Sequence, residues 1–445
     1  MQQPLRIAVV GSGLVGSLLA LYLKRAGHDV DVFDRSQDIR TVDFSGRSIN
    51  LAMSTRGWKA LDGVGIGDAI RAIAIPMDKR AIHAVDGSIA YQKYGMAGES
   101  IYSISRGELN RMMIDLTQSE GVNFFFEKKI WDVKLDEAII CIGETERGAW
   151  EELKYDKVFG ADGAFSKVRN RMQKLNRFDY QQHFLNIGYK ELKIEANSSG
   201  AHRIDKNSFH IWPRGEFMLI ALPNLEGSFT CTLFVPFEGE YSMESLKEPA
   251  DVQAFFERFF PDAITLIPDL LRDFFHNPTS SLVTTQCFPW TYQDKVALIG
   301  DAAHAIVPFY GQGMNAGFED ITQLSDLMQL HGDDWLQIFK DYEQVRKPNA
   351  DAIAELSYRN FIEMSTKTAD ADFLLRKKIE AWFTDLHPEK WLPLYDRVTF
   401  SHKPYVEALE IGDKQKSIMD EVMALPQIAD QWQTAQVEQL ILSRL

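Results

Sequence analysis

The chain is poor in cysteine and has no long apolar run. Its 445 residues include three cysteines, Cys141, Cys231 and Cys287, which lie far apart. Their odd number and wide spacing exclude a disulfide framework and a cysteine-based metal site, and they favour a reducing compartment. No apolar stretch reaches the length of a membrane-spanning helix, and residues 5–10 run into glycines rather than into a signal-peptide pattern. We therefore expect a cytoplasmic protein with no metal and no membrane anchor.

Positive charge is also scarce. The chain has 48 Lys and Arg against 63 Asp and Glu, a formal net charge of −15. This balance excludes nucleic acid or an anionic membrane as the main partner, although a local basic cluster can still bind a small anion. The length allows two or three domains of about 150 residues each. The composition leaves the oligomeric state open between monomer and homodimer.

A β-α-β unit is predicted at the start of the chain. Residues 5–10 form a short apolar run, residues 15–26 have helical apolar spacing that ends at Gly27, and residues 29–33 are apolar again. Further buried strands are predicted within residues 122–135, 137–145, 154–163 and 294–300.

Two other patterns follow. Residues 186–236 alternate between polar and apolar, which predicts an antiparallel sheet with one covered face. After residue 320 the periodicity is helical to the end of the chain. Breaks in these helices are expected at Pro348, Pro388, Pro393 and Pro404.

The first turn of the β-α-β unit carries a dinucleotide-binding pattern. Gly11 permits a tight turn, Gly13 lets the backbone approach a pyrophosphate, and Gly16 lets the helix pack closely on the strand. Asp34 ends the second strand, where its carboxylate can bind both ribose hydroxyls and would repel a 2′-phosphate. The pattern predicts FAD or NAD rather than NADP; the alternative is a glycine-rich turn that binds nothing.

Remote motifs favour FAD. "YDKVFGADGAFSKVR" places Asp162 and Gly163 after a strand, and "LIGDAAHAIVP" places Asp301 after another. A glycine-rich segment then precedes a helix, and "ISRGEL" contains Arg106. In this order the motifs resemble the signature of the group A flavoprotein monooxygenases, the single-component aromatic hydroxylases. The resemblance covers most of residues 5–320.

The resemblance implies specific FAD contacts. Asp301 is expected to bind the ribityl chain, and the helix after Gly313 to point its positive end at the pyrimidine edge of the flavin, where the reduced ring is negative. Asp162 and Gly163 are associated in that family with both FAD and NADPH. NADPH has no second glycine motif here, so it is expected to dock transiently as a co-substrate. The predicted cofactor residues are Gly11, Gly13, Val15, Gly16, Phe33, Asp34, Arg35, Ala52, Arg106, Asp301, Gly313, Met314 and Asn315.

His304 lies between two of these motifs. It is either an acid–base group or a structural residue that bonds within the flavin loop, and a packed turn favours the structural interpretation. No partner at metal-ligand spacing accompanies it.

Four further segments, residues 46–57, 79–95, 358–364 and 392–401, resemble the kynurenine 3-monooxygenase family. That resemblance implies that Arg80 and Tyr94 hold the carboxylate of L-kynurenine. It also implies that Asn360 and Tyr395 contribute the remaining contacts to the substrate. Without the resemblance, the sequence would predict that Arg80 is a solvated surface charge and that Tyr94 and Tyr395 are ordinary half-buried aromatic residues. The expected apolar wall against the substrate ring consists of Pro308, Phe309 and Tyr310, with Met364 and Phe217 beside it.

The implied reaction is an aromatic hydroxylation. NADPH reduces FAD, O₂ gives a C4a-hydroperoxyflavin, and the ring carbon ortho to the amine takes the distal oxygen to form 3-hydroxykynurenine. The amino group activates the ring, so no strong protein base is required. One alternative is a group A hydroxylase of another aromatic, such as a phenolic acid, and another is a non-enzymatic FAD-binding module. Tryptophan halogenases are excluded because their W-x-W-x-I-P segment is missing.

The expected fold is α/β. A Rossmann-like FAD-binding domain of the p-hydroxybenzoate-hydroxylase type would comprise residues 1–75, 96–180 and 280–325. An inserted antiparallel β-sheet substrate domain would comprise residues 76–95 and 181–279. A helical region at residues 326–445 would cover the substrate pocket.

Overall fold

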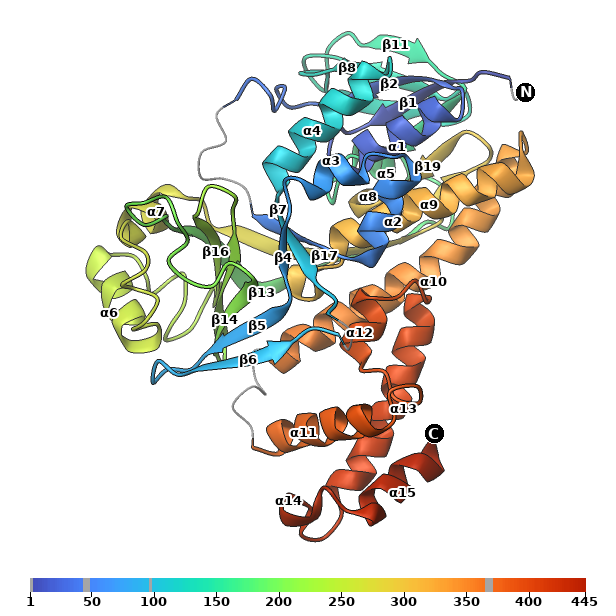
Figure 1. Cartoon of the computed structure of the whole chain (residues 1–445). Coiled ribbons are helices and arrows are strands. Elements are labelled where there is room, and N and C mark those ends of the chain that lie inside the picture. The colour runs from blue at the N-terminus through green and yellow to red at the C-terminus, as the bar shows by residue number, and fades with distance from the viewer. Residues whose placement is uncertain (1–2, 43–48, 96–97, 365–370) are drawn as a thin grey trace.

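The N-terminal β-α-β unit is confirmed by the computed structural model, which describes residues 3–42, 49–95, 98–364 and 371–445 (Figure 1). It consists of β1 (Arg6–Val10), α1 (Leu14–Arg25) and β2 (Asp29–Phe33). Gly27 follows the helix with a φ of 95°, a conformation that glycine adopts without strain. Residues 46–48 of the segment 46–57, and the expected domain boundary at residue 96, lie outside the described residues.

The unit is the centre of a six-stranded sheet in the order β18-β19-β12-β1-β2-β8. All neighbours pair in parallel except β18 with β19. The added strands are β8 (Asn123–Phe125), β12 (Lys157–Gly160), β18 (Thr291–Tyr292) and β19 (Val296–Leu298). Because parallel strands share their carboxyl edge, this edge brings the loops after β1, β12 and β19 together. These loops contain the three predicted FAD motifs.

Short helices and two small sheets surround this core. One three-stranded sheet consists of β3 (Asn50–Met53), β7 (Ile101–Ser105) and β4 (Ile75–Met77). The other consists of β9 (Ile130–Lys134), β10 (Ile139–Ile142) and β11 (Glu151–Lys154). The helices are α2 (Thr55–Gly63), α3 (Gly67–Arg71), α4 (Arg106–Ser119), α5 (Lys167–Met172), α8 (Asp301–His304) and α9 (Gly313–His331), with the 3₁₀ turn η1 (Pro308–Tyr310).

The inserted sheet has seven strands in the order β17-β13-β16-β15-β14-β5-β6. Only β14 and β5 pair in parallel within it, among the described strands. Its strands are β5 (Lys79–His83), β6 (Ile89–Lys93), β13 (Asp179–Ile194), β14 (Ser208–Arg214), β15 (Phe217–Pro223), β16 (Phe229–Pro236) and β17 (Ser280–Phe288). The domain boundaries stay a prediction, and β17 pairs with β13 although its residues were expected in the FAD-binding domain.

Both faces of this sheet are covered, so the expectation of a single covered face is wrong. On one face, Phe217 and Leu219 pack with side chains of α6 (Pro249–Phe259) and α7 (Leu270–His276). On the other, Met218 and Phe234 pack against Phe309 of η1. In Figure 1, α6 and α7 lie on the side of the sheet away from the C-terminal helices. The second face is therefore available to form the wall of a site.

The C-terminal part is helical, as predicted. It contains α10 (Trp335–Ile362), α11 (Ala371–Leu386), α12 (Leu394–Thr399), α13 (Tyr405–Met423), α14 (Ile428–Gln431) and α15 (Ala435–Arg444). The breaks at Pro388, Pro393 and Pro404 are confirmed, and the last two residues directly precede α12 and α13. The break at Pro348 is wrong, because α10 continues through it. Buried residues on either side, such as Arg346 and Ala350, hold the helix together by packing.

No helix in the described ranges is long and apolar enough to cross a membrane.

Candidate active site

A cavity of about 460 Å³ runs from the glycine turn after β1 to the seven-stranded sheet and α12. Seventeen of the predicted site residues, Tyr310 included, line it. They are Gly11, Gly13, Val15, Phe33, Asp34, Arg35, Ala52, Arg80, Arg106, Asp301, Pro308, Phe309, Tyr310, Gly313, Met314, Met364 and Tyr395. The sheet edge and the C-terminal helices thus contribute to one continuous site.

The glycine turn leaves room for a ligand at one position only. A Cβ at Gly11 would lie 2.4 Å from the carbonyl oxygen of Ala161, and one at Gly16 would lie 1.9 Å from that of Gly11. A Cβ at Gly13 would meet nothing within 4 Å. Gly13 is also the N-cap of α1, and no side chain caps this helix end. The backbone therefore presents free amide donors and open space where a pyrophosphate fits.

Asp34 is oriented by the same turn. The backbone N–H and the hydroxyl of Ser12 donate to Asp34 Oδ2 at 2.8 and 2.9 Å, and the N–H of Ser36 donates to Oδ1 at 2.8 Å. A carboxylate fixed in this way at the end of β2 faces the cavity as a hydrogen-bond acceptor. This arrangement suits the two hydroxyls of a ribose.

Asp162 borders the cavity from the loop after β12. Its Oδ2 accepts the N–H of Lys167 at 2.6 Å, while Oδ1 is buried and has no partner among the described residues. Burial raises the pKa of this carboxyl above its ordinary value. A buried acceptor without a partner is costly in a folded protein, and a ligand hydroxyl or amine in the cavity would satisfy it.

Asp301 and Arg106 approach the middle of the cavity from two different elements. Asp301 begins α8 and Arg106 begins α4, and both line the cavity. Burial raises the pKa of the Asp301 carboxyl, and the positive charge of Arg106 opposes that shift. The Asp301 carboxyl is therefore in a position to hydrogen-bond to a polar ligand in the cavity.

The N-terminus of α9 lies beside the loop after β3. Asn315 donates to the carbonyl oxygens of Ala52 at 2.9 Å and Gly311 at 2.8 Å, and its Oδ1 accepts the N–H of Ser54 at 2.9 Å. Asn315 is fully buried and does not line the cavity. Its side chain holds the two loops together, which leaves Met314 and the backbone at Gly313 to face a ligand.

His304 lies behind the cavity wall. Its Nε2 is 2.6 Å from Asp320 Oδ2, and its ring stacks on Trp290 with the centroids 5.1 Å apart. Asp320 also accepts from Arg346 Nε at 2.7 Å and from the N–H of Gly300 at 3.0 Å. The arrangement supports the structural interpretation of His304. Within the described ranges, no group of His, Cys, Asp and Glu could hold a metal ion.

At the far end of the cavity, Arg80 is surrounded by aromatic rings. Its Nε donates to Tyr94 Oη at 3.2 Å, and its guanidinium carbon lies 4.1 Å from the ring centroid of Tyr395. Tyr395 in turn stacks on Tyr310 at 5.4 Å. No carboxylate in the described part of the chain lies within ion-pair distance of Arg80. A half-buried cation that lines a cavity and has no carboxylate within ion-pair distance in the described chain is suited to bind an anionic group.

Two predicted substrate residues lie one layer behind the cavity. Tyr94 is buried against Tyr395, with the ring centroids 5.5 Å apart. Asn360 donates to the carbonyl oxygen of Phe309 at 2.7 Å, and its Nδ2 lies 3.4 Å from Met364 Sδ. Neither Tyr94 nor Asn360 lines the cavity. Through these bonds they hold Arg80 and Phe309, which do line it.

Sequence reasoning missed the contribution of the seven-stranded sheet. Besides Arg80, six of its side chains line the cavity: Tyr189, Phe209, Ile220, Leu222, Thr232 and Phe234. Phe217 lies on the opposite face, where its ring packs against Phe259 at 4.8 Å. Successive residues of a strand point to opposite faces, so the parity of β15 separates Phe217 from Ile220. The sequence shows that Phe217 and Ile220 point to opposite faces of the sheet, but it does not show which face lines the cavity.

The residues fit FAD. Gly13 leaves open space beside free helix amides, Asp162 has an unsatisfied buried oxygen, and Asp34 and Asp301 lie at two further points along one cavity. The fold and this site define a flavoprotein of the FAD-dependent oxygenase class. A family model described as "FAD binding domain" matches residues 5–357.

Similar proteins narrow the class. The chain is 69% identical over 445 residues to kynurenine 3-monooxygenase of Flavobacterium johnsoniae, and the match covers 100% of both chains. It is 44% identical to kynurenine 3-monooxygenase of Dictyostelium discoideum, covering 94% of this chain and 93% of that protein. The chain belongs to the kynurenine 3-monooxygenase family. The fold is also that of 2-methyl-3-hydroxypyridine-5-carboxylic acid oxygenase, with a TM-score of 0.68 at 20% identity over 84% of this chain and 96% of that one.

Proposed function

We propose that this protein uses FAD, NADPH and O₂ to hydroxylate L-kynurenine at ring C3, giving 3-hydroxykynurenine. The observation that carries the proposal is Arg80, a cation without a carboxylate partner in the described chain, at the end of the cavity away from the glycine turn. The names of the relatives, including the 69% identical protein of Flavobacterium johnsoniae, point to the same substrate.

Arg80 is the residue proposed to bind the substrate carboxylate. Its guanidinium already lies against the rings of Tyr395 and Tyr94, so few conformations remain for it to lose on binding. A charge-assisted pair in this partly dry pocket orients the amino-acid end of the substrate. The aromatic end then points along the cavity toward η1 and the N-terminus of α9.

The apolar wall is proposed to exclude water from the reacting ring. Phe309 lies between Phe361 at 4.5 Å and Phe234 at 5.0 Å, and Asn360 fixes its carbonyl oxygen. Pro308 and Tyr310 extend this wall along the cavity. A rigid, dry wall favours oxygen transfer to substrate over reaction with water.

FAD, when bound, accepts a hydride from NADPH and activates O₂. The chain supplies its binding groups: the amides after Gly13, the carboxylates of Asp34 and Asp301, and the N-terminus of α9 beside Met314. The positive end of α9 would stabilise negative charge at the pyrimidine edge of the ring. NADPH is proposed to dock transiently at the cavity mouth.

A cytoplasmic location is part of the proposal, because the three cysteines are all unpaired and buried.

The test is NADPH consumption by the purified yellow protein, measured with L-kynurenine, with a phenolic acid such as 4-hydroxybenzoate, and without any substrate. We expect stimulation by L-kynurenine alone. Stimulation by the phenolic acid alone would move the assignment to another aromatic substrate. A flavin spectrum without any stimulated oxidation would indicate a binding module.

A further inference from the structure

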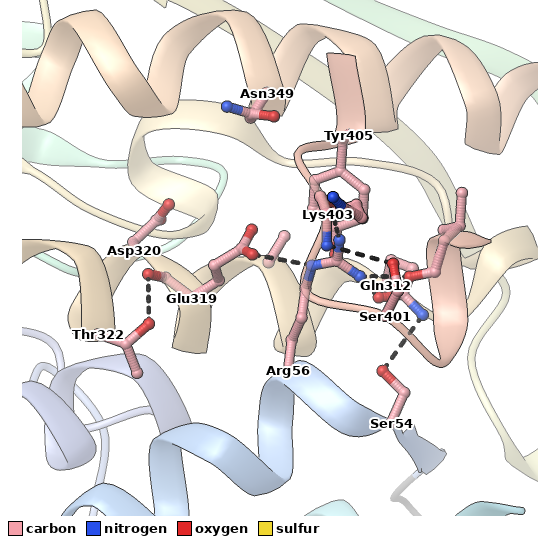
Figure 2. A network of polar contacts seen from close by, with 12 residues as sticks. Ser54, Arg56, Gln312, Glu319, Asp320, Thr322, Asn349, Ser401, Lys403 and Tyr405 are labelled. Carbon is pink, nitrogen blue, oxygen red and sulfur yellow. Dashed lines mark hydrogen bonds and ion pairs between the residues drawn. The ribbon is translucent and has the colours of Figure 1, made fainter. Parts of the chain in front are cut away.

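A buried arginine outside the cavity connects the FAD-binding part to the C-terminal helices. Arg56 is the second residue of α2, and its side chain is 1% exposed. Its Nε donates to Glu319 Oε1 of α9 at 2.8 Å. Its Nη1 donates to the carbonyl oxygen of Val398 and its Nη2 to that of Lys403. Figure 2 shows Lys403 beside Arg56. Every guanidinium nitrogen therefore has a partner, and two of the partners are backbone atoms of the segment 398–403.

Tyr405, the first residue of α13, contacts the start of α9. The guanidinium of Arg56 lies over the ring of Tyr405, with its central carbon 4.0 Å from the ring centroid. The Tyr405 hydroxyl donates to Gln312 Oε1 at 2.9 Å, and Gln312 is the fully buried residue that precedes α9. Figure 2 shows Arg56 between Glu319 on one side and Tyr405 and Gln312 on the other. Arg56 thus binds the C-terminal segment and the flavin-facing helix at once.

The position of Val398 gives this contact a consequence in the cavity. Val398 and Tyr395 belong to the same short helix, α12, within one turn of each other. Tyr395 lines the cavity and stacks on Arg80, whereas the carbonyl oxygen of Val398 is held by Arg56. A helix of six residues is too short to be stable by itself, so the bond between Arg56 and its last turn helps to fix the orientation of Tyr395.

We propose that Arg56 is a positioning residue that, through α12, holds Tyr395 in place against Arg80 at the substrate-carboxylate end of the cavity. It touches neither substrate nor cofactor and acts through Tyr395. The binding part of this inference rests on the proposed function, but the anchoring of α12 does not.

The first test is a double-mutant cycle on the dissociation constant of L-kynurenine, read from the flavin absorbance of the holoenzyme. Arg56→Lys keeps the charge near Glu319 and cannot reach both carbonyl oxygens at once. We expect Arg56→Lys, which loses hydrogen bonds to the backbone behind α12, and Tyr395→Leu, which loses the ring against Arg80, each to weaken binding about tenfold. The double variant should also weaken binding about tenfold, rather than about a hundredfold. Independent, multiplying effects would overturn the proposal.

The matched control is Arg214→Lys. Arg214 is a half-buried arginine that also donates to backbone carbonyl oxygens, those of His83 and Phe259, and its hydrogen bonds within the described chain do not involve α12. Its replacement should leave L-kynurenine binding within about twofold of wild type, because these effects are local. An equal loss of affinity in Arg214→Lys would show that Arg56 acts by general destabilisation, and would also overturn the proposal.

A second measurement needs no substrate. Hydrogen–deuterium exchange of the holoenzyme should be faster in residues 394–405 of Arg56→Lys than in wild type, and unchanged there in Arg214→Lys. If wild type does not bind L-kynurenine, the proposed function fails while this measurement still decides whether Arg56 anchors α12. Unchanged exchange in Arg56→Lys contradicts the anchor. Should Arg56→Lys not fold, Tyr405→Phe, which loses only the bond to Gln312, is expected to show the same faster exchange in a milder form.

Discussion

The guanidinium of Arg80 on β5 lies 4.1 Å from the ring centre of Tyr395 on α12, and this contact joins the inserted sheet to the C-terminal helices. It closes the end of a cavity whose other end is the glycine turn after β1. One chain thus presents an anion-binding group and a dinucleotide-binding turn to the same space. That arrangement suits an enzyme that holds an amino-acid substrate beside a flavin.

Replacing Arg80 with Ala should reduce kcat/KM for L-kynurenine by the equivalent of about 2–4 kcal/mol, because a partly desolvated charge-assisted pair is lost. Steady-state kinetics with product detection measure this. Lys79→Gln is the matched control, since Lys79 is the adjacent cation but pairs with Asp205 at 3.0 Å and does not line the cavity. Unchanged kinetics in Arg80→Ala would remove Arg80 from the substrate site.

Gly13→Val should abolish FAD binding without unfolding the protein. The added side chain meets no protein atom within 4 Å at its Cβ, so it would occupy the space assigned to the pyrophosphate. The flavin content after purification and the melting curve of the apoprotein check this. Gly11→Val is the contrast, because its Cβ would lie 2.4 Å from the oxygen of Ala161 and should prevent folding. A Gly13→Val protein that retains its yellow colour would contradict the cofactor placement.

Asp396 should make stability depend on pH. Burial and the negative charge of Glu99 raise the pKa of its carboxyl from 3.8 to about 6. Below about pH 4 this carboxyl is protonated in both the folded and the unfolded state, so it does not affect stability. As the pH rises from about 4 to about 6, the unfolded state ionises more readily than the folded one, and the free energy of unfolding falls. Asp396→Asn should therefore raise the melting temperature at pH 8 and leave it nearly unchanged at pH 4.

The same substitution should tighten L-kynurenine binding at pH 8, because it removes a negative charge that acts on Arg80. Equal melting temperatures for wild type and Asp396→Asn at pH 8 would show that this carboxylate is well solvated.

His304→Gln should weaken the fold without changing the chemistry. Loss of the short contact with the buried carboxylate of Asp320 should cost about 1–3 kcal/mol in the free energy of unfolding. The pH dependence of kcat should keep its shape, since His304 does not line the cavity. Chemical denaturation and a pH–rate profile measure the two effects. A lost ionisation in the kcat profile would make His304 an acid–base catalyst after all.

Sequence reasoning placed the FAD motifs well because each is local. Gly11, Gly13 and Gly16 determine a turn by their own backbone requirements, and the strand before Asp301 is recognisable from its apolar run. The topological rule that ligands bind at the carboxyl edge of parallel strands then brought three distant segments together. The structure places all three around one cavity.

The errors came from tertiary packing. Nothing in the sequence near Pro348 shows that buried neighbours such as Arg346 would carry α10 through it. The face of β15 that meets the cavity depends on where α6 and η1 pack, so Phe217 was assigned to the wrong face. Arg56 lies in the segment 46–57, but the sequence does not indicate its role, because its partners Glu319, Val398 and Lys403 are remote in sequence.

The most direct test of the proposed activity uses isotopically labelled O₂. The holoenzyme is incubated with NADPH, L-kynurenine and labelled O₂, and the product is identified by mass and by comparison with authentic 3-hydroxykynurenine. The account predicts one labelled oxygen atom on the ring carbon next to the amine, with NADPH consumed in step with product. NADPH consumption that yields only hydrogen peroxide, or a product without the label, would contradict it.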